Sequence, residues 1–424
     1  MERTQQTSIE KAYEIAKEIY ASYGVDTDQA ITQTLAVPLS LHCWQGDDVV
    51  GFEGSDSLSG GGILATGNYP GRARNGDELR QDASFAFSLI PGKKRFNLHA
   101  MYAETGGKKV DRDELEPEHF KKWIDWAQEQ QIALDFNPTF FSHPKASSGY
   151  TLAHPDNAIR QFWVRHGKAC RRIAAYLGKT LNEPCIDNIW IPDGSKDLPL
   201  DRLGPRERLF DSLNEILKES YPAGHIIDTV ESKLFGIGSE AYVVGSHEFY
   251  MGYAVQRQIG LCLDMGHFHP TETIHDKISA LSLFVPTVLL HISRGIRWDS
   301  DHVVLYSDDV RDVCRAVVRA NLVNRVAFAL DFFDASINRI AAWVIGARSF
   351  RLALLEAFLE PVNQIRKAEM GGKLHERLAL MEEAKTLPFT AVWDYLCYRE
   401  HIPNGPTWRS QVERYEREVL SHRR

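Results

Sequence analysis

Eight short apolar segments separated by helix-periodic stretches constrain the fold of this chain more than any other feature. The apolar segments are residues 37–44, 95–102, 133–141, 186–192, 225–233, 260–269, 287–293 and 325–333. Helical patterns occupy residues 118–131, 157–178, 207–220, 275–284 and 308–321. Nearly continuous apolar strands that alternate with helices predict a parallel sheet covered by helices, and eight such units close into a (β/α)₈ TIM barrel. The alternative, an open doubly wound sheet, is disfavoured because no GxGxxG motif follows the first strand.

Segments outside this alternation predict three additions to the barrel. Residues 1–23 are polar and helix-periodic, so we expect an N-terminal helix and assign residues 1–340 to one catalytic barrel domain. Residues 341–424 are rich in Leu, Glu and Arg and are too long for one closing helix. They predict a C-terminal helical extension, which we expect to make subunit contacts. The Gly- and Ser-rich residues 50–66 predict a mobile loop over the barrel mouth.

Composition excludes several classes of protein. The chain has 424 residues, 43% of them hydrophobic, and a formal net charge of −8 without a long basic run, which argues against a nucleic-acid partner. Its six scattered cysteines form no CxxC pair and are interpreted as reduced core residues. The N-terminus lacks the apolar run of a signal peptide, and no stretch of about 18 apolar residues predicts a membrane span. We therefore expect a cytoplasmic protein.

Acidic and histidine residues recur where the later predicted strands end. Taken singly, each has an ordinary structural explanation, because an acid after a strand often caps a helix and a histidine often hydrogen-bonds inside a core. Taken together, buried carboxylates at one barrel mouth would repel one another, and divalent cations resolve that repulsion. Four adjacent strands supply one full ligand set: Glu231, Asp264, His291 and Asp331. Residues slightly further along supply a second set with open positions: His267, Asp299 and Asp301.

The donor types indicate which cations to expect. Carboxylate oxygens and imidazole nitrogens without cysteine favour Mn²⁺, Mg²⁺ or Co²⁺ over a structural zinc ion. The D-x-D spacing of Asp299 and Asp301 lets two carboxylates of one loop flank one ion, although this motif alone is a weak signal. His269, Asp334 and His302 lie near these positions, and the sequence assigns them no separate role.

Long strings of residues also resemble a known family. They include LHCWQGDDVVGFE from Leu41, NLHAMY from Asn97, NIWIPDG from Asn188, VESKLFGIG from Val230, LDMGHFHPTE from Leu263, RWDSDHVV from Arg297 and LDFFDASINRIAAWVIG from Leu330. On these strings the chain resembles the L-rhamnose isomerases, in the xylose-isomerase-like barrel superfamily, over nearly its whole length.

The resemblance implies roles for particular residues. A structural metal site carries over to the four-residue set, and a mobile catalytic metal carries over to the set that contains His267 and Asp299. Lys233 is similar to the family lysine at the sugar's O1, and His99 to the histidine placed for ring opening. Trp190 is similar to an aromatic residue that borders the substrate, and Trp44 to a wall of the pocket. The implied catalytic residues are Lys233, His99, Asp299 and His267.

The resemblance further implies two divalent cations per subunit, most readily Mn²⁺ with Mg²⁺, Co²⁺ or Zn²⁺ as alternatives, a sugar substrate and a homotetramer. The implied reaction interconverts L-rhamnose and L-rhamnulose. Because metal-bound acids leave few free bases near the substrate, we expect a metal-assisted hydride shift between C1 and C2, or a metal-hydroxide variant of it, with a proton route through an enediol as the alternative.

Other interpretations remain open from the residues alone. Lys233 has the alternative of a snorkelling surface lysine, and Trp190 that of core packing. Another barrel sugar isomerase or an epimerase fits the same fold, although an epimerase at C3 needs two free glutamates beside one metal. A metallohydrolase that cleaves phosphodiesters needs a basic clamp, which Arg294 and Arg297 could supply. A non-catalytic sugar-binding protein has little reason to keep two cation sites.

Overall fold

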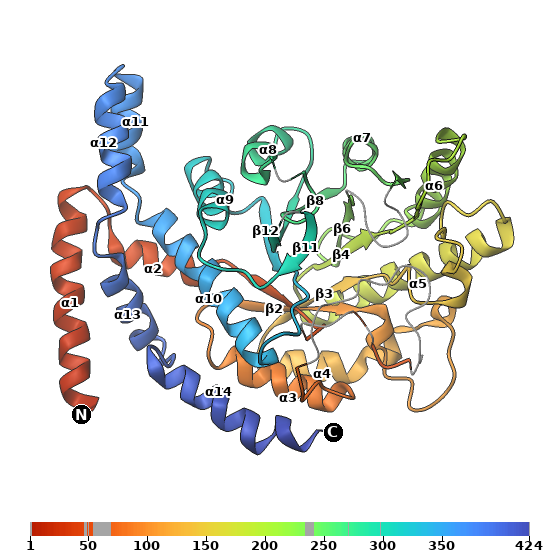
Figure 1. Ribbon diagram of the computed structural model, residues 1–424, viewed down its shortest axis with the longest axis horizontal. Coiled ribbons are helices and arrows are strands. Elements are labelled where there is room, and N and C mark those ends of the chain that lie inside the picture. Colours follow the sequence, from red (N-terminus) through yellow and green to blue (C-terminus); the bar gives the residue numbers. More distant parts are fainter. Residues whose placement is uncertain are drawn as a thin grey trace.

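Eight parallel strands close into a barrel at the centre of the molecule (Figure 1), which confirms the predicted (β/α)₈ architecture. The computed structural model describes residues 2–45, 49, 51–53, 69–233, 241–269, 271–296 and 298–423, with only the backbone for residues 2–5 and 298–301. Around the barrel the strands follow the order β1-β12-β9-β8-β6-β4-β3-β2. Their bounds are β1 Leu39–His42, β2 Lys94–His99, β3 Ala133–Asn137, β4 Cys185–Trp190, β6 Ile226–Glu231, β8 Gly260–Asp264, β9 Val288–Ile292 and β12 Val326–Leu330.

Helices cover the outside of the barrel and extend it at both chain ends (Figure 1). They are α1 Glu2–Ser22, α2 Thr27–Ala36, α3 Gly76–Phe87, α4 Lys121–Gln130, α5 Asn157–Leu181, α6 Leu203–Ile216, α7 His247–Arg257, α8 Ile274–Leu281, α9 Asp308–Arg319, α10 Arg339–Phe358, α11 Val362–Met370, α12 Leu374–Ala384, α13 Phe389–Arg399 and α14 Pro406–Glu418. Local sequence fixes several ends: Asp156 caps α5 by accepting from the Ala158 N–H, and Asn182 ends it in a left-handed conformation.

Two small antiparallel ribbons accompany the barrel. One pairs β5 (Gly194–Ser195) with β7 (Tyr242–Val243), and the other pairs β10 (Arg294–Ile296) with β11 (Trp298–His302). The second ribbon begins two residues after β9 ends. The backbone of the predicted D-x-D residues, Asp299 and Asp301, lies in β11 of this ribbon.

Side chains alternate between the barrel interior and the helix layer, as the pleat of a strand requires. The interior has a polar base, an apolar middle and a polar top. The apolar middle is a small cluster of Ile186, Cys262, Leu289 and Ala329. Residues two positions further along the same strands, such as Asp264 after Cys262 and His291 after Leu289, therefore face the carboxyl end of the barrel, which positions the candidate site.

The predicted C-terminal extension is helical, as expected. Helix α10 packs against α9, α2 and α3 and so covers the barrel, and Arg351 on it donates to the carbonyls of Thr34 and Val37. The division expected between residues 340 and 341 falls in the first turn of this helix. Helices α11 and α12 project from the molecule beyond the C-terminal end of α1 (Figure 1), and α13 packs against α1. Subunit contacts through this extension stay a prediction.

Three further expectations concern the loop, the membrane and the cysteines. Most of the Gly- and Ser-rich residues 50–66 lie outside the described residues, so the predicted mobile loop stays a prediction. Among the described residues, no helix combines the length and apolarity that crossing a bilayer requires. The six cysteines are free and buried, in agreement with the interpretation that they are reduced core residues.

Candidate metal centre and substrate cavity

Four buried side chains meet at the carboxyl end of the barrel. Glu231 ends β6, Asp264 ends β8, His291 lies in β9 and Asp331 directly follows β12, and each offers a ligand atom within 4.8 Å of the others. The His291 Nδ1 lies 3.1 Å from Asp331 Oδ2, 3.4 Å from Glu231 Oε2 and 3.5 Å from Asp264 Oδ2. The register brings them together, because Asp264 pairs directly with His291 across β8 and β9. This is the four-residue set that the sequence predicts.

Several atoms of this cluster are in ion-pair contact but make no hydrogen bond of normal geometry to the described residues. In the described part of the chain, Asp264 Oδ2, Asp331 Oδ1 and both ring nitrogens of His291 have no hydrogen bond of normal geometry. Leaving a buried polar atom unsatisfied costs about 1–3 kcal/mol, and more for a charged one. Three carboxylates and one imidazole are ligands that divalent cations such as Mn²⁺ accept. The residues present therefore fit a divalent cation.

The protonation equilibria of the cluster indicate the same need for positive charge. Burial disfavours the charged form of His291, but the thiol of Cys262 and the surrounding carboxylates outweigh it and raise the His291 pKa. Burial raises the pKa of Asp331 to about 6, although contact with His291 opposes the shift. Burial also acts to raise the pKa of Glu231, but His291 and His267 outweigh it and lower that pKa. Without a cation, protons therefore supply part of the missing positive charge.

Neighbouring polar groups fix the orientation of the candidate ligands. Asn188 Nδ2 donates to Glu231 Oε2 at 2.5 Å, and Thr229 Oγ1 in turn donates to Asn188 Oδ1 at 2.8 Å. The Gly266 N–H and Ser293 Oγ donate to Asp264 Oδ1 at 2.6 and 3.1 Å. Such supporting bonds hold a ligand for a metal and tune its basicity. Sequence reasoning missed these groups, although the inward position of Asn188 in β4 was a usable signal.

The second predicted ligand set is only partly described. His267 is buried, and its Nδ1 lies 2.9 Å from the Ser232 carbonyl oxygen and 3.0 Å from Glu231 Oε1. The side chains of Asp299 and Asp301 lie outside the described residues, so their role stays a prediction. Asp334 caps the turn before α10 by accepting from the Ser336 N–H at 3.0 Å.

A small aromatic cavity opens beside the four-residue cluster. Trp44 stacks on Phe333 with ring centroids 5.7 Å apart, and Phe141 meets Trp190 edge-on at 5.5 Å. The other lining residues are Val49, His99, Asn137, Glu231, His267 and Asp331. Lys233 is 5% exposed, with its Nζ 4.8 Å from the centre of the Trp190 ring. The structure thus places Trp44, His99 and Trp190 on the walls, with Lys233 against Trp190.

His99 is held in a defined orientation. Its Nδ1 lies 2.7 Å from Thr139 Oγ1, and burial lowers its pKa to about 3, so the ring is neutral near pH 7. The Thr139 N–H donates to His166 Nε2 at 3.0 Å, while His166 Nδ1 contacts the Arg112 carbonyl oxygen. The Arg112 guanidinium donates to the carbonyls of Thr139 and Ser142. Sequence reasoning missed Thr139, because it lies in the loop beyond β3.

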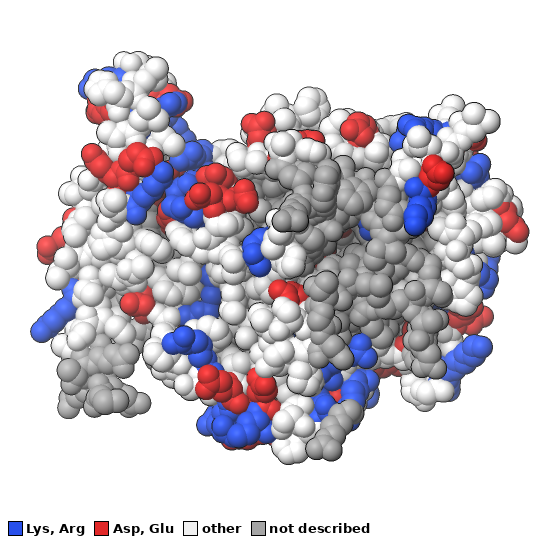
Figure 2. Space-filling view, in the orientation of Figure 1, with Lys and Arg blue, Asp and Glu red and all other residues white. Residues whose placement is uncertain are grey.

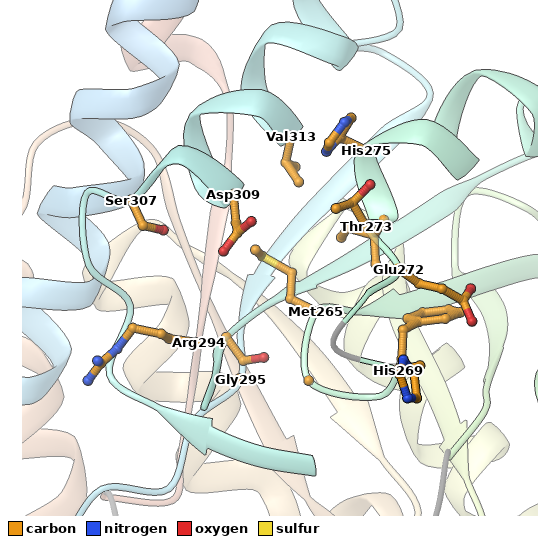
Figure 3. Close-up of a pocket in the computed structure, with 14 residues that line it drawn as sticks. Met265, His269, Glu272, Thr273, His275, Arg294, Gly295, Ser307, Asp309 and Val313 are labelled. Atoms are coloured by element: carbon orange, nitrogen blue, oxygen red, sulfur yellow. The ribbon is translucent and has the colours of Figure 1, made fainter. Parts of the chain in front are cut away.

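A second hollow lies between the N-terminal ends of α8 and α9 (Figure 3). His269, Glu272, Arg294 and Asp309 are among the residues that line it. His269 is exposed and its Nδ1 contacts Thr271 Oγ1, so the structure separates it from the cluster around Glu231. On the face shown in Figure 2, the described Lys and Arg side chains are interspersed with Asp and Glu.

Comparisons with known proteins identify the family. The model of the family L-rhamnose isomerase (RhaA) matches residues 7–423. An L-rhamnose isomerase of Rhodopirellula baltica is 59% identical over 98% of this chain and 97% of that protein, and one of Salmonella paratyphi B is 56% identical over 98% and 99%. The solved structure of an L-ribulose 3-epimerase aligns with 79% of this chain and 97% of that chain, with a TM-score of 0.49 and 11% identity. Matches that span nearly the whole chain at this identity show that it belongs to the L-rhamnose isomerase family of aldose–ketose isomerases.

Proposed function

We propose that this chain interconverts L-rhamnose and L-rhamnulose. Membership of the family supports the reaction, and the observation that carries it here is the buried cluster of Glu231, Asp264, His291 and Asp331 at the edge of an aromatic cavity. A neutral sugar offers hydroxyl oxygens to a cation and C–H faces to aromatic rings. A divalent cation bound by the cluster supplies Lewis-acid polarisation of adjacent sugar oxygens.

The residues around the cavity then have separate tasks. His99 is neutral and has its Nδ1 engaged by Thr139, so its Nε2 serves as the proton relay when the sugar ring opens. Lys233 is close to Trp190 at the cavity wall, and it donates to O1 of the open chain. Trp190 and Trp44 hold the carbon skeleton and exclude water.

We propose that hydrogen passes directly from C2 to C1 as a hydride, while the O2 hydroxyl loses its proton and O1 gains one, so that the carbonyl moves from C1 to C2. The carboxylates of the cluster are committed as ligands, which leaves few free bases beside the substrate carbons among the residues that the structure describes. Turnover in deuterated water tests the route. The direct shift predicts product without solvent deuterium at C1 or C2, and rapid incorporation there would support the enediol route instead.

We propose Mn²⁺ as the preferred cation, with Mg²⁺, Co²⁺ or Zn²⁺ as possible replacements. The first ion is assigned to the four-residue cluster. The second is assigned to His267, Asp299 and Asp301, which supply two carboxylates and one imidazole. Metal analysis of the purified chain, before and after reconstitution with each ion, tests both the identity and the number.

The reaction itself is tested by a ketose assay on a panel of aldoses with chelator-treated protein. We expect no turnover without metal, and restoration by Mn²⁺ with L-rhamnose as the best substrate. Undiminished turnover after removal of all metal, or ketose formation only from other aldoses, would refute the proposed function.

We also propose a homotetramer in which residues 341–424 contribute contacts. The projecting helices α11 and α12 support this, because exposed Leu374 and Leu378 on α12 have apolar side chains available to a second copy. Light scattering measures the mass directly. Charged substitutions at these two leucines are expected to lower the measured mass. An unchanged mass would show that α12 does not contribute to the subunit interface.

A further inference from the structure

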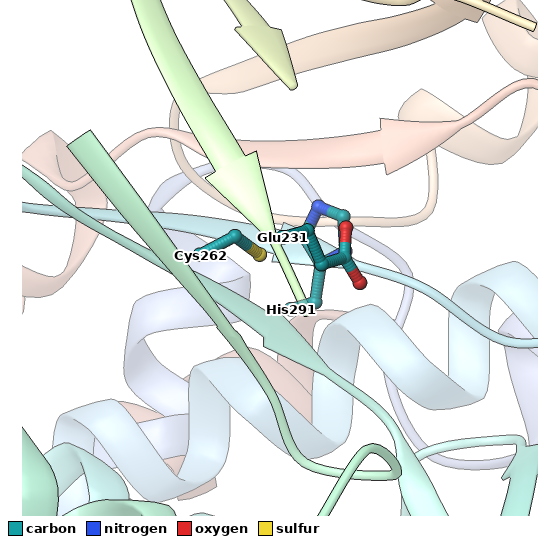
Figure 4. A group of neighbouring side chains, drawn as sticks. All are labelled: Glu231, Cys262 and His291. Carbon is teal, nitrogen blue, oxygen red and sulfur yellow. The ribbon is translucent and has the colours of Figure 1, made fainter. Parts of the chain in front are cut away.

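A cysteine lies directly beneath the candidate metal cluster. Cys262 in β8 is 1% exposed and pairs in register with Glu231 of β6. Figure 4 shows its thiol directed from β8 toward the side chains of Glu231 and His291. The Cys262 sulfur, a Glu231 carboxylate oxygen and a His291 ring nitrogen all lie within 4.8 Å of one another. The sequence analysis interpreted Cys262 as an ordinary core residue and did not identify its position beside the candidate ligands.

We propose that Glu231, Cys262 and His291 form an alternative cation site, overlapping the four-residue cluster, that takes thiophilic divalent ions such as Cd²⁺ and Zn²⁺. Thiolate sulfur favours soft ions, whereas the set completed by Asp264 and Asp331 offers oxygen and nitrogen alone. One carboxylate, one thiolate and one imidazole are also donors that four-coordinate ions accept, with one position left open.

The two sites exclude each other because they share two ligands. Glu231 and His291 belong to both sets, so an ion drawn toward Cys262 removes both from the carboxylate set. On the side away from the cluster, Cys262 packs against Ile186, Leu289 and Ala329, which offer no ligand. The Cys262 sulfur can therefore bind only ions that approach from the side of the four-residue cluster. We expect thiophilic ions to compete with Mn²⁺ for the barrel top.

Cys262 is distinguished from the other cysteines by its neighbours. In the part of the chain that the structure describes, it is the only one of the six that joins a group of candidate ligands. Cys314, in α9, is equally buried but lies in the helix layer, so it provides a matched control.

Absorbance spectroscopy of the chelator-treated full chain tests this site without a measurement of turnover. Addition of one equivalent of Cd²⁺ is expected to produce a thiolate-to-metal charge-transfer band in the ultraviolet, and excess Mn²⁺ is expected to diminish it. Cys262→Ala is expected to abolish the band and to weaken Cd²⁺ binding at least about tenfold, while Cys314→Ala retains both. Cys262→Ser preserves the side-chain volume, so it replaces the alanine variant if that variant fails to fold.

The outcomes separate this site from the proposed function. No band in the wild-type chain, or an equal band in the folded Cys262 variants, would overturn the site whether or not the chain isomerises L-rhamnose. If Mn²⁺ does not diminish the band, Cys262 and the carboxylate set bind separate ions at the same time. That result would overturn the proposal that the two sites share ligands.

Discussion

The base and the top of the barrel interior both bury charged side chains, but they balance those charges differently. At the base, Arg95 Nη2 lies 2.7 Å from Asp135 Oδ1, and Asp135 also accepts from Ser40 Oγ at 2.7 Å and the Ile186 N–H at 3.0 Å. At the top, the carboxylates of Glu231, Asp264 and Asp331 surround one imidazole, and several of their atoms make no hydrogen bond of normal geometry among the described residues.

This difference separates a structural charge cluster from a functional one. The guanidinium of Arg95 supplies the positive charge that the base needs, so the charge network at the base is complete without a bound ion. The top has no arginine or lysine among its four members, and within those four only His291 can carry a proton-borne positive charge. Substitutions at the base should therefore affect stability, and substitutions at the top should affect metal binding and turnover.

Glu231→Gln gives the largest expected effect. It keeps the side-chain shape but removes one anionic ligand, so we expect turnover of L-rhamnose to fall about 10³-fold, the upper end for losing one charge-stabilising group. Steady-state kinetics and Mn²⁺ content measure this loss, and circular dichroism controls for the fold. Full activity with normal metal content would show that the top cluster, like the base, has only a structural role.

Arg95→Met should act in the opposite way. It leaves the buried Asp135 carboxylate without its partner, which costs about 3–5 kcal/mol of unfolding free energy. Because the base lies one layer below the apolar middle, kcat per folded molecule should stay near the wild-type value. Denaturant unfolding and kinetics on the same preparation test this, and a large loss of kcat in folded protein would contradict the separation.

Lys233→Met tests the cavity beside the top cluster. We expect kcat to fall about 10²–10³-fold because a charge placed at O1 is lost, while Mn²⁺ content stays unchanged. The ring of Trp190 can still pack against the methionine, so the fold should be retained. Near-normal kcat would make Lys233 a packing residue only.

Thr139→Val has the smallest expected effect. The isosteric change removes the contact with His99 Nδ1, so the imidazole loses the group that sets its tautomer and orientation, and we expect about tenfold lower kcat with little change in KM. Thr139→Ser should restore kcat and the shape of its pH profile. If serine fails to restore them, Thr139 acts through loop packing and not through His99.

The strands were predictable because buried parallel strands read as apolar runs, yet their ends were not. The run at residues 133–141 corresponds to β3 at Ala133–Asn137, because Phe140 and Phe141 continue the apolar pattern into the loop that walls the cavity. Similarly, Phe332 and Phe333 extend the last run beyond β12. Apolar side chains therefore mark burial, whereas the end of a strand depends on backbone pairing.

The candidate site shows the same limit. Acids and histidines at successive strand ends were visible because parallel strands end at one mouth, and this identified Glu231 and His291. Thr139 and Cys262 were not identifiable, since their importance depends on which neighbours the register brings beside them. Asn188 was an intermediate case: a polar residue inside an apolar strand, whose partner Glu231 becomes evident only from the pairing of β4 with β6.

Equilibrium dialysis of chelator-treated protein against Mn²⁺ tests the central claim most directly. If the top of the barrel holds a cation, the wild-type chain retains at least one Mn²⁺ and the variant carrying both Asp264→Asn and Asp331→Asn loses that ion while it remains folded. No retained Mn²⁺ in the wild type, or equal retention in the variant, would contradict the account.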